Sequence, residues 1–124
     1  MNGAEVTAVS SSSTSAQIKA DNSLLLTNSY TDLLSSIDAV YIASHPTKHY
    51  NHVKQALLAG KHVLCESPIA LSEAECNELY QLANSKNLIL MDAIKTAYST
   101  AYNRLLLLLN SGKIGQVLSV ESTC

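Results

Sequence analysis

The polar residues of this sequence that are best placed to do chemistry follow a short apolar run. The run spans residues 62–65, and Glu66, Ser67 and Pro68 come directly after it. A carboxylate in such a place can accept hydrogen bonds from sugar hydroxyls, and a proline after Ser67 fixes how the chain leaves the run. These residues predict a binding site for a small polar molecule, with a plain surface glutamate before a turn as the equally weighted alternative.

Five short apolar runs, rich in valine, isoleucine and leucine, alternate with helical patterns and would position such a site. This alternation is typical of βαβ units on a parallel sheet. The run over 39–43 shows no polar alternation, which predicts a central strand covered by helices on both faces. In an open sheet of this kind, ligands bind outside the carboxyl ends of the strands. The runs span residues 5–9, 24–26, 39–43, 62–65 and 88–91, and the residues to examine after them are Ser10, Ser11, 44–47, 66–68 and 92–95.

Helices are predicted between the runs by apolar residues at three- and four-residue spacing. One such helix spans 48–59, and Gly60 then supplies the left-handed residue that closes it. Another begins at Ser72, which forms a capping box with Glu75 and is followed by an inward stripe of Cys76, Leu79 and Ala83.

A last helix is predicted over 100–111, before an alternating pattern over 116–123 that is typical of a strand with one solvated face. This strand would open a second domain. We therefore divide the chain into a partial domain with a parallel sheet, residues 1–97, and the start of a second domain, residues 98–124.

Composition limits the classes of function. The 124 residues have room for one domain with a core, and a net charge of −2 gives no sign of a nucleic-acid partner. The longest apolar run, residues 105–109, is far below the roughly 18 residues that span a membrane. Three irregularly spaced cysteines fit a reducing compartment. We expect a cytoplasmic protein with a small-molecule partner, no membrane and no nucleic acid.

Histidines and cysteines offer two further hypotheses. His45, His49 and His52 fall on one helical face, but lysines share the segment and carboxylate or thiolate ligands do not, so we expect no metal. Cys65 ends an apolar run with no evident base, which favours a buried structural thiol over a nucleophile.

Two long segments resemble one enzyme family. The stretch DAVYIASHPTKHYNHVKQALLAGKHVLCESPIALSEAE resembles the Gfo/Idh/MocA oxidoreductases, from the fourth strand of their nucleotide domain to the loop with the motif EKP. The continuation MDAIKTAYSTAYNRLLLLLNSGKIGQVLSVEST is similar to the passage into their second domain. The resemblance implies an α/β fold, namely a Rossmann-like parallel sheet with flanking helices that runs into an α+β domain. It also implies hydride transfer between NAD or NADP and a sugar, polyol or related hydroxyl compound.

The resemblance also assigns residues. By it, Ala43 and Ser44 would line the dinucleotide cleft, His49 would open the following helix, Glu66 would contact the nicotinamide ribose and Pro68 would shape the loop. These residues would act by positioning the reacting carbons.

Ser10, Ser11 and His45 complete the expected cofactor-binding set, but with departures from the family. Ser10 and Ser11 stand where an acidic residue usually contacts the ribose of NAD, within a serine-rich stretch whose other interpretation is a mobile loop. His45 stands before Pro46, which reverses the usual order.

Three further departures concern catalysis. Ser67 occupies the position of the family's lysine, so a hydroxyl replaces a cation. The four glycines never form G-x-G-x-x-G, so we expect a chain without the first strand and its glycine-rich turn. The family's catalytic histidine lies beyond the residues matched, so the catalytic residues stay unknown.

We therefore expect part of an NAD(P)-dependent oxidoreductase that forms a homo-oligomer. The alternative is a non-catalytic α/β module that self-associates through an exposed sheet edge. Zinc binding through the three histidines is a weaker third hypothesis.

Overall fold

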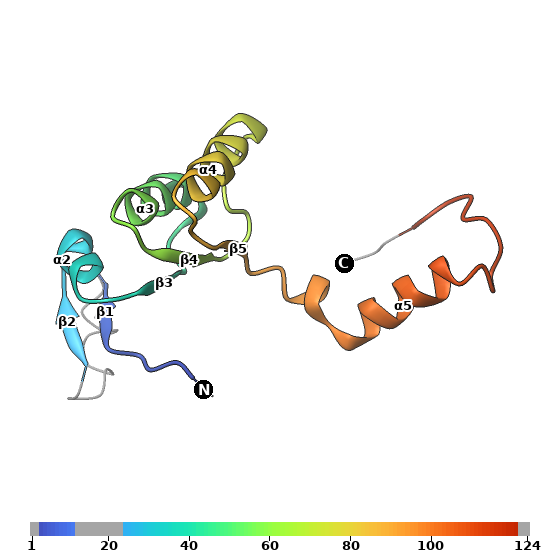
Figure 1. Cartoon of the computed structure of the whole chain (residues 1–124), viewed down its shortest axis with the longest axis horizontal. Helices are drawn as coiled ribbons and strands as arrows, with labels where there is room; N and C mark the ends of the chain where they lie inside the picture. Colours follow the sequence, from blue (N-terminus) through green and yellow to red (C-terminus); the bar gives the residue numbers. More distant parts are fainter. Residues whose placement is uncertain (1–2, 12–23, 122–124) are drawn as a thin grey trace. The chain divides into compact units, whose positions relative to one another are not determined.

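The structure is a computed structural model that describes residues 3–11 and 24–121. The chain divides into two compact units, Met1–Ala93 and Ile94–Cys124. The first unit carries the described strands and most of the helices (Figure 1). Its strands are β1 (Ala8–Ser10), β2 (Leu25–Thr27), β3 (Ala39–Ile42), β4 (His62–Cys65) and β5 (Leu90–Asp92), and its helices are α2 (Tyr30–Ser35), α3 (Pro46–Leu58) and α4 (Glu73–Ser85).

All the described strand pairs are parallel, as predicted. β1 pairs with β2 in one sheet, and β3, β4 and β5 form a second sheet in that order. The register of the larger sheet sets Ile42 beside Cys65, and Cys65 beside Asp92. The carboxyl ends of its three strands therefore meet at one edge, which is where an α/β sheet binds ligands.

Both ends of α3 follow from local sequence. Pro46 is the first helical residue, where its missing N–H costs nothing, and the His45 side chain caps the helix by accepting a bond from the Thr47 amide. At the other end Gly60 has a φ of +76°, and the amides of Gly60 and Lys61 donate to carbonyls of the last turn. This closure confirms the predicted left-handed glycine.

α4 begins as predicted at Ser72, whose hydroxyl accepts a bond from the Glu75 amide. The return bond differs from the prediction, because the Glu75 carboxylate accepts from the amide of Leu71 rather than from that of Ser72. The helix ends at Ser85, and a left-handed residue that the pattern did not reveal, Asn87, follows its cap with a φ of 55°. Asparagine tolerates this conformation because its side chain can bond locally.

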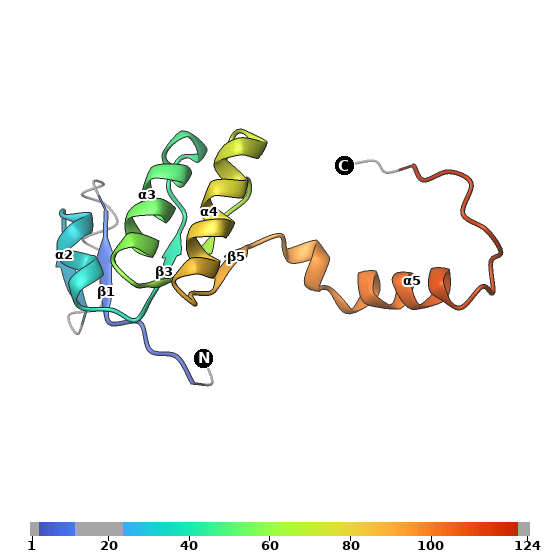
Figure 2. The same cartoon turned by 45° about the horizontal axis from the view of Figure 1, so that its top comes forward.

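The core lies on one face of the larger sheet. Figure 2 shows α3 and α4 side by side over that face, and Leu57 on α3 and Leu79 on α4 are fully buried there. Two leucines of α2, Leu33 and Leu34, join the same cluster. Val53, Ala56, Val63, Cys65 and Ala83 are also buried.

The predicted place of β3 was wrong in two respects. Within the described residues, β3 lies at an edge of its sheet and β4 is central. Its burial alternates, because Val40 and Ile42 face the helices while Tyr41, which is 56% exposed, faces away. Polar alternation was missing from the sequence because Ala39 and Tyr41, on the open face, are not strongly polar.

The second unit is described by itself. It holds a short 3₁₀ helix, Lys95–Tyr98, and α5, Thr100–Asn110, with Gly112 at a φ of +71° after the predicted end. The strand predicted over 116–123 is wrong for residues 116–121, which form no strand, and the remainder lies outside the described residues. Leu118 in this segment is 89% exposed. A strand forms only beside a hydrogen-bonded neighbouring strand, and the described residues offer none to this segment. None of the described helices is both long and apolar enough to cross a bilayer.

Candidate functional site

The residues that follow β3 and β4 meet the last residue of β5 at one edge of the larger sheet, which we name the carboxyl rim. It consists of residues 43–45, residues 66–68 and Asp92. Backbone bonds tie its parts together, because the Glu66 amide donates to the Ile42 carbonyl at 2.9 Å and the Ala93 amide to the Cys65 carbonyl at 2.8 Å. The parallel pairing thus assembles segments far apart in the chain.

Two side-chain hydrogen bonds cross the strands at the rim. The Tyr41 hydroxyl on β3 donates to the Glu66 carboxylate after β4, and the Ser67 hydroxyl donates to the Asp92 carboxylate on β5. The bond to Glu66 raises the pKa of Tyr41, so the phenol stays a donor. A carboxylate has about four acceptor positions, and Tyr41 occupies one of those on Glu66. Glu66 is half-buried and Ser67 is exposed. The rim can therefore still accept hydrogen bonds from a hydroxylated ligand.

A buried histidine lies beneath the rim. His49 is 1% exposed, its Nδ1 lies 2.7 Å from the Pro68 carbonyl oxygen, and its Nε2 lies 2.8 Å from the Ser44 carbonyl oxygen. The fixed φ of Pro46 and the helical turn that follows place this ring between the two loops.

His52 occupies a different environment from His49. Its Nδ1 lies 3.0 Å from the Ser44 hydroxyl, and its ring lies 4.8 Å from that of Tyr30 between centroids. Burial lowers the pKa of His52, and electrostatic repulsion from Lys48 and His49 lowers it further. A neutral ring is the form favoured there.

The three histidines of the metal hypothesis do not converge. His45 is exposed and caps α3, His49 faces two carbonyls, and His52 faces Ser44. In residues 3–11 and 24–121 the structure brings together no group of three His, Cys, Asp or Glu side chains that could hold a metal ion.

Cys65 is a buried thiol, as the sequence favoured. It is fully buried at the end of β4, and its Sγ lies 3.4 Å from the Glu66 carbonyl oxygen. Burial raises the pKa of Cys65 to about 12, with smaller contributions from the carboxylates of Asp92 and Glu66. The thiolate that a nucleophile requires is therefore scarce at neutral pH.

Ser10 and Ser11 lie on the other sheet. Ser10 ends β1, and both residues are half-buried. The rest of the serine-rich stretch lies outside the described residues. Their contact with a ribose or phosphate stays a prediction.

The rim carries groups that can hydrogen-bond to the hydroxyls of a sugar. Glu66 and Ser67 offer a carboxylate and a hydroxyl at the strand ends, as ribose hydroxyls require. Ala43 is exposed beside them, and His45, with its side chain also exposed, opens α3. Among the described residues no glycine-rich turn is present to bring backbone amides against a pyrophosphate. Six of the eight predicted cofactor-binding residues lie at or directly beneath the rim, namely Ala43, Ser44, His45, His49, Glu66 and Pro68.

Tyr41 contributes to the rim but was not predicted from the sequence. Tyr41 reads as one more apolar residue of a strand, and only the strand register places it beside Leu64, two residues before Glu66 on the same face. The contact between the Ser67 hydroxyl and the Asp92 carboxylate was also not foreseen from the sequence.

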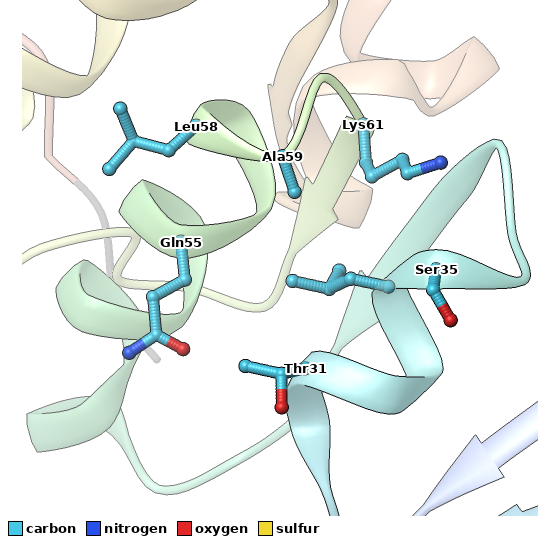
Figure 3. A pocket seen from close by; sticks show the side chains of 7 residues that line it. Thr31, Ser35, Gln55, Leu58, Ala59 and Lys61 are labelled. Carbon is cyan, nitrogen blue, oxygen red and sulfur yellow. The ribbon is translucent and has the colours of Figure 1, made fainter.

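An open pocket in the described part of the chain lies away from the rim. It has a volume of about 460 Å³ and lies between α2 and the last turns of α3 (Figure 3). Lys61, which precedes β4, places it toward the amino ends of the strands, opposite the edge where α/β sheets bind ligands. Its lining residues are Thr31, Leu34, Ser35, Gln55, Leu58, Ala59 and Lys61.

Comparison with known proteins gives matches of sequence and of structure. Residues 1–93 match the family model described as an oxidoreductase family with an NAD-binding Rossmann fold, GFO_IDH_MocA. An uncharacterized oxidoreductase of Schizosaccharomyces pombe is 40% identical over 88 residues, which are 71% of this chain and 24% of that protein. The D-xylose 1-dehydrogenase (NADP(+)) of Hypocrea jecorina is 35% identical over 91 residues, which are 72% of this chain and 23% of that enzyme.

A solved structure of a dehydrogenase also matches this chain. The apo scyllo-inositol dehydrogenase of Lactobacillus casei superposes with a TM-score of 0.81 at 27% identity, over 90% of this chain and 35% of that one. The chain thus spans about a quarter of the length of the curated relatives named above.

Proposed function

Because the chain belongs to the Gfo/Idh/MocA family of oxidoreductases with an NAD-binding Rossmann fold, we propose that it contributes the nicotinamide-side half of a dinucleotide site. The enzyme of which this site is part would oxidise or reduce a hydroxyl carbon of a sugar, polyol or related compound. One observation carries the proposal. The carboxylate of Glu66 lies at the carboxyl rim of a parallel sheet in a chain that matches this family. The relatives named for D-xylose and scyllo-inositol oxidation support the substrate class.

The residues of the rim would bind and orient rather than react. Glu66 would accept hydrogen bonds from the nicotinamide ribose, with Tyr41 holding the carboxylate in place through its hydroxyl. Ala43 and Ser44 would line the cleft, with Pro68 shaping the loop opposite them. When bound, a nicotinamide supplies the hydride acceptor or donor, and the protein supplies its position.

Ser67 sets the limit on chemistry at this rim. Its hydroxyl donates to Asp92, so its oxygen keeps acceptor capacity for a substrate hydroxyl but brings no positive charge. A cation at this place would stabilise charge on the substrate oxygen. We therefore expect nucleotide binding to survive better than hydride transfer.

Titration of the purified chain with NADH and with NADPH, followed by nucleotide fluorescence, tests the proposal. Binding by the unsubstituted chain, weakened roughly tenfold in Glu66→Gln, is the expected result because a charge-assisted hydrogen bond is lost. Glu73→Gln is the matched control, since Glu73 is an exposed glutamate in the first turn of α4. Equal weakening in both variants, or no binding of either nucleotide, would contradict the proposal. The nucleotide that binds with the lower dissociation constant shows whether the site prefers NADH or NADPH.

A second candidate function is a non-catalytic module that self-associates. It is favoured by the open sheet edges, because β3 and β5 each have a neighbour on one side only among the described strands. Such edges can pair with another chain. Sedimentation at increasing concentration separates the candidates, since dimers without nucleotide binding favour the module and nucleotide binding favours the enzyme.

Assembly and location complete the proposal. The open face of the larger sheet exposes Tyr41, Leu64 and Met91, which supports a homo-oligomer that covers them. Cys65 and Cys76 are free thiols, which supports the reducing cytoplasm as the location.

A further inference from the structure

Among the described residues, His49 is the one polar side chain that is buried. Its two ring nitrogens lie 2.7 Å and 2.8 Å from the carbonyl oxygens of Pro68 and Ser44. A ring enclosed in this way does not reach a ligand at the rim. Any effect of His49 on the site must therefore pass through the two loops that it contacts.

The two carbonyl partners of His49 indicate how many of its ring nitrogens carry a proton. A carbonyl oxygen only accepts hydrogen bonds, whereas a neutral imidazole carries a single N–H. In the neutral form, one of the two carbonyls would face a nitrogen lone pair at hydrogen-bond distance, which is repulsive. Only the imidazolium, with a proton on each nitrogen, satisfies both Ser44 and Pro68.

We propose that His49 is a positioning residue that is protonated on both ring nitrogens and ties the loop after β3 to the loop after β4. The two contacts hold the backbone at Ser44 and at Pro68, and Glu66, two residues before Pro68, is thereby held in its place at the rim. This inference rests on the proposed function, because holding the rim affects binding only if a nucleotide binds there.

His52 lies one turn further along α3 than His49. Burial lowers the pKa of His52, and repulsion from Lys48 and His49 lowers it further. The titratable and charged side chains on the elements around His49 are Tyr30 and Asp32 on α2, Tyr41 on β3, His45, Lys48, Tyr50, His52 and Lys54 on and before α3, His62, Cys65 and Glu66 on and after β4, Asp92 on β5, and Glu73, Glu75, Cys76, Glu78 and Tyr80 on α4.

Nitrogen NMR of the histidine rings in the unsubstituted chain tests the charge directly. Two protonated ring nitrogens at neutral pH, with N–H protons that exchange slowly with solvent, are the expected result. A ring with one protonated nitrogen would overturn the proposal. This measurement needs no nucleotide and no variant.

His49→Gln tests the consequence for the rim, because one amide cannot donate to two carbonyls on opposite sides. We expect the NADH or NADPH dissociation constant to rise roughly tenfold and the Glu66 amide to exchange faster with solvent. His62→Gln is the matched control, since His62 begins β4 at the opposite end and accepts a bond from the Ile89 amide. Circular dichroism confirms that each variant is folded.

The outcomes separate the two proposals. If the unsubstituted chain binds neither nucleotide, the proposed function fails, and the ring NMR alone decides the charge and the tie. If nucleotide binds and His49→Gln changes neither affinity nor exchange, the positioning role is overturned while the proposed function stands.

Discussion

The two faces of the β3-β4-β5 sheet carry similar side chains in opposite environments. On the covered face, Val40, Val63 and Leu90 lie beneath α3 and α4 and are almost fully buried. On the open face, Leu64 and Met91 are 39% and 40% exposed. Apolar character thus does not decide which face of this sheet is the core. The helices decide it, since they bring their own apolar stripes to one side only.

The largest expected difference between the two faces comes from leucine truncation. Leu79→Ala removes a fully buried side chain of α4 over the covered face and should cost about 3 kcal/mol of unfolding free energy, through lost burial and a cavity. Leu64→Ala on the open face should cost under about 1 kcal/mol, because the side chain is already hydrated in part. Urea denaturation followed by circular dichroism measures both. Equal costs would mean that the open face is covered in solution.

The open face also carries a polar contact that links the sheet to the rim. Tyr41→Phe removes the hydroxyl that donates to Glu66 and should lower the unfolding free energy by less than the leucine truncation on the covered face, since the contact is exposed. The same variant should weaken nucleotide binding, because the Glu66 carboxylate loses its anchor. Denaturation and nucleotide titration of one preparation give both numbers. A loss of stability with unchanged nucleotide affinity would show that Tyr41 supports the fold but not nucleotide binding.

A pH effect is expected from the covered side. The pKa of His52 in the folded protein is lowered below its ordinary value of 6.5, so the folded state binds protons there less readily than the unfolded state. The resulting stability is complete well above pH 6.5 and is lost as the pH falls through the lowered pKa. Between pH 8 and pH 5, the melting temperature should therefore fall more steeply in the unsubstituted chain than in His52→Gln. Parallel curves would show that other groups cause the fall.

The smallest effect is expected on the outer surface of the covering helices. Lys54 on α3 forms an ion pair with Glu78 on α4 at 2.6 Å, and Tyr50 donates to the same carboxylate at 2.7 Å. These contacts lower the pKa of Glu78 and raise that of Lys54, but both groups are exposed. Lys54→Met should leave the unfolding free energy nearly unchanged, because an exposed ion pair is screened by solvent. A larger loss in urea denaturation would show that the bridge between α3 and α4 matters more than their buried stripes.

Features set by a few neighbouring residues could be predicted from the sequence. The left-handed Gly60, the cap at Ser72, the inward stripe of α4 and the bounds of β4 each depend on local spacing. The placement of Glu66 and Pro68 after a parallel strand follows from the same pattern.

Features that depend on distant pairing could not be predicted in this way. The contact of Tyr41 with Glu66 requires the register of two strands, and the enclosure of His49 requires two loops to meet over α3. The expectation that β3 is covered on both faces failed because the helices pack on one. The predicted strand over residues 116–121 failed because its pattern specifies a solvated face but not the neighbour that must bond to it.

The burial of Cys65 makes its thiol a reporter of local opening. Because burial raises the pKa of this thiol to about 12 and the side chain is fully buried, alkylating reagents can modify it only when the end of β4 separates from the helices above. The rate of alkylation therefore measures how often this part of the sheet opens, and a ligand bound at the rim would lower that rate.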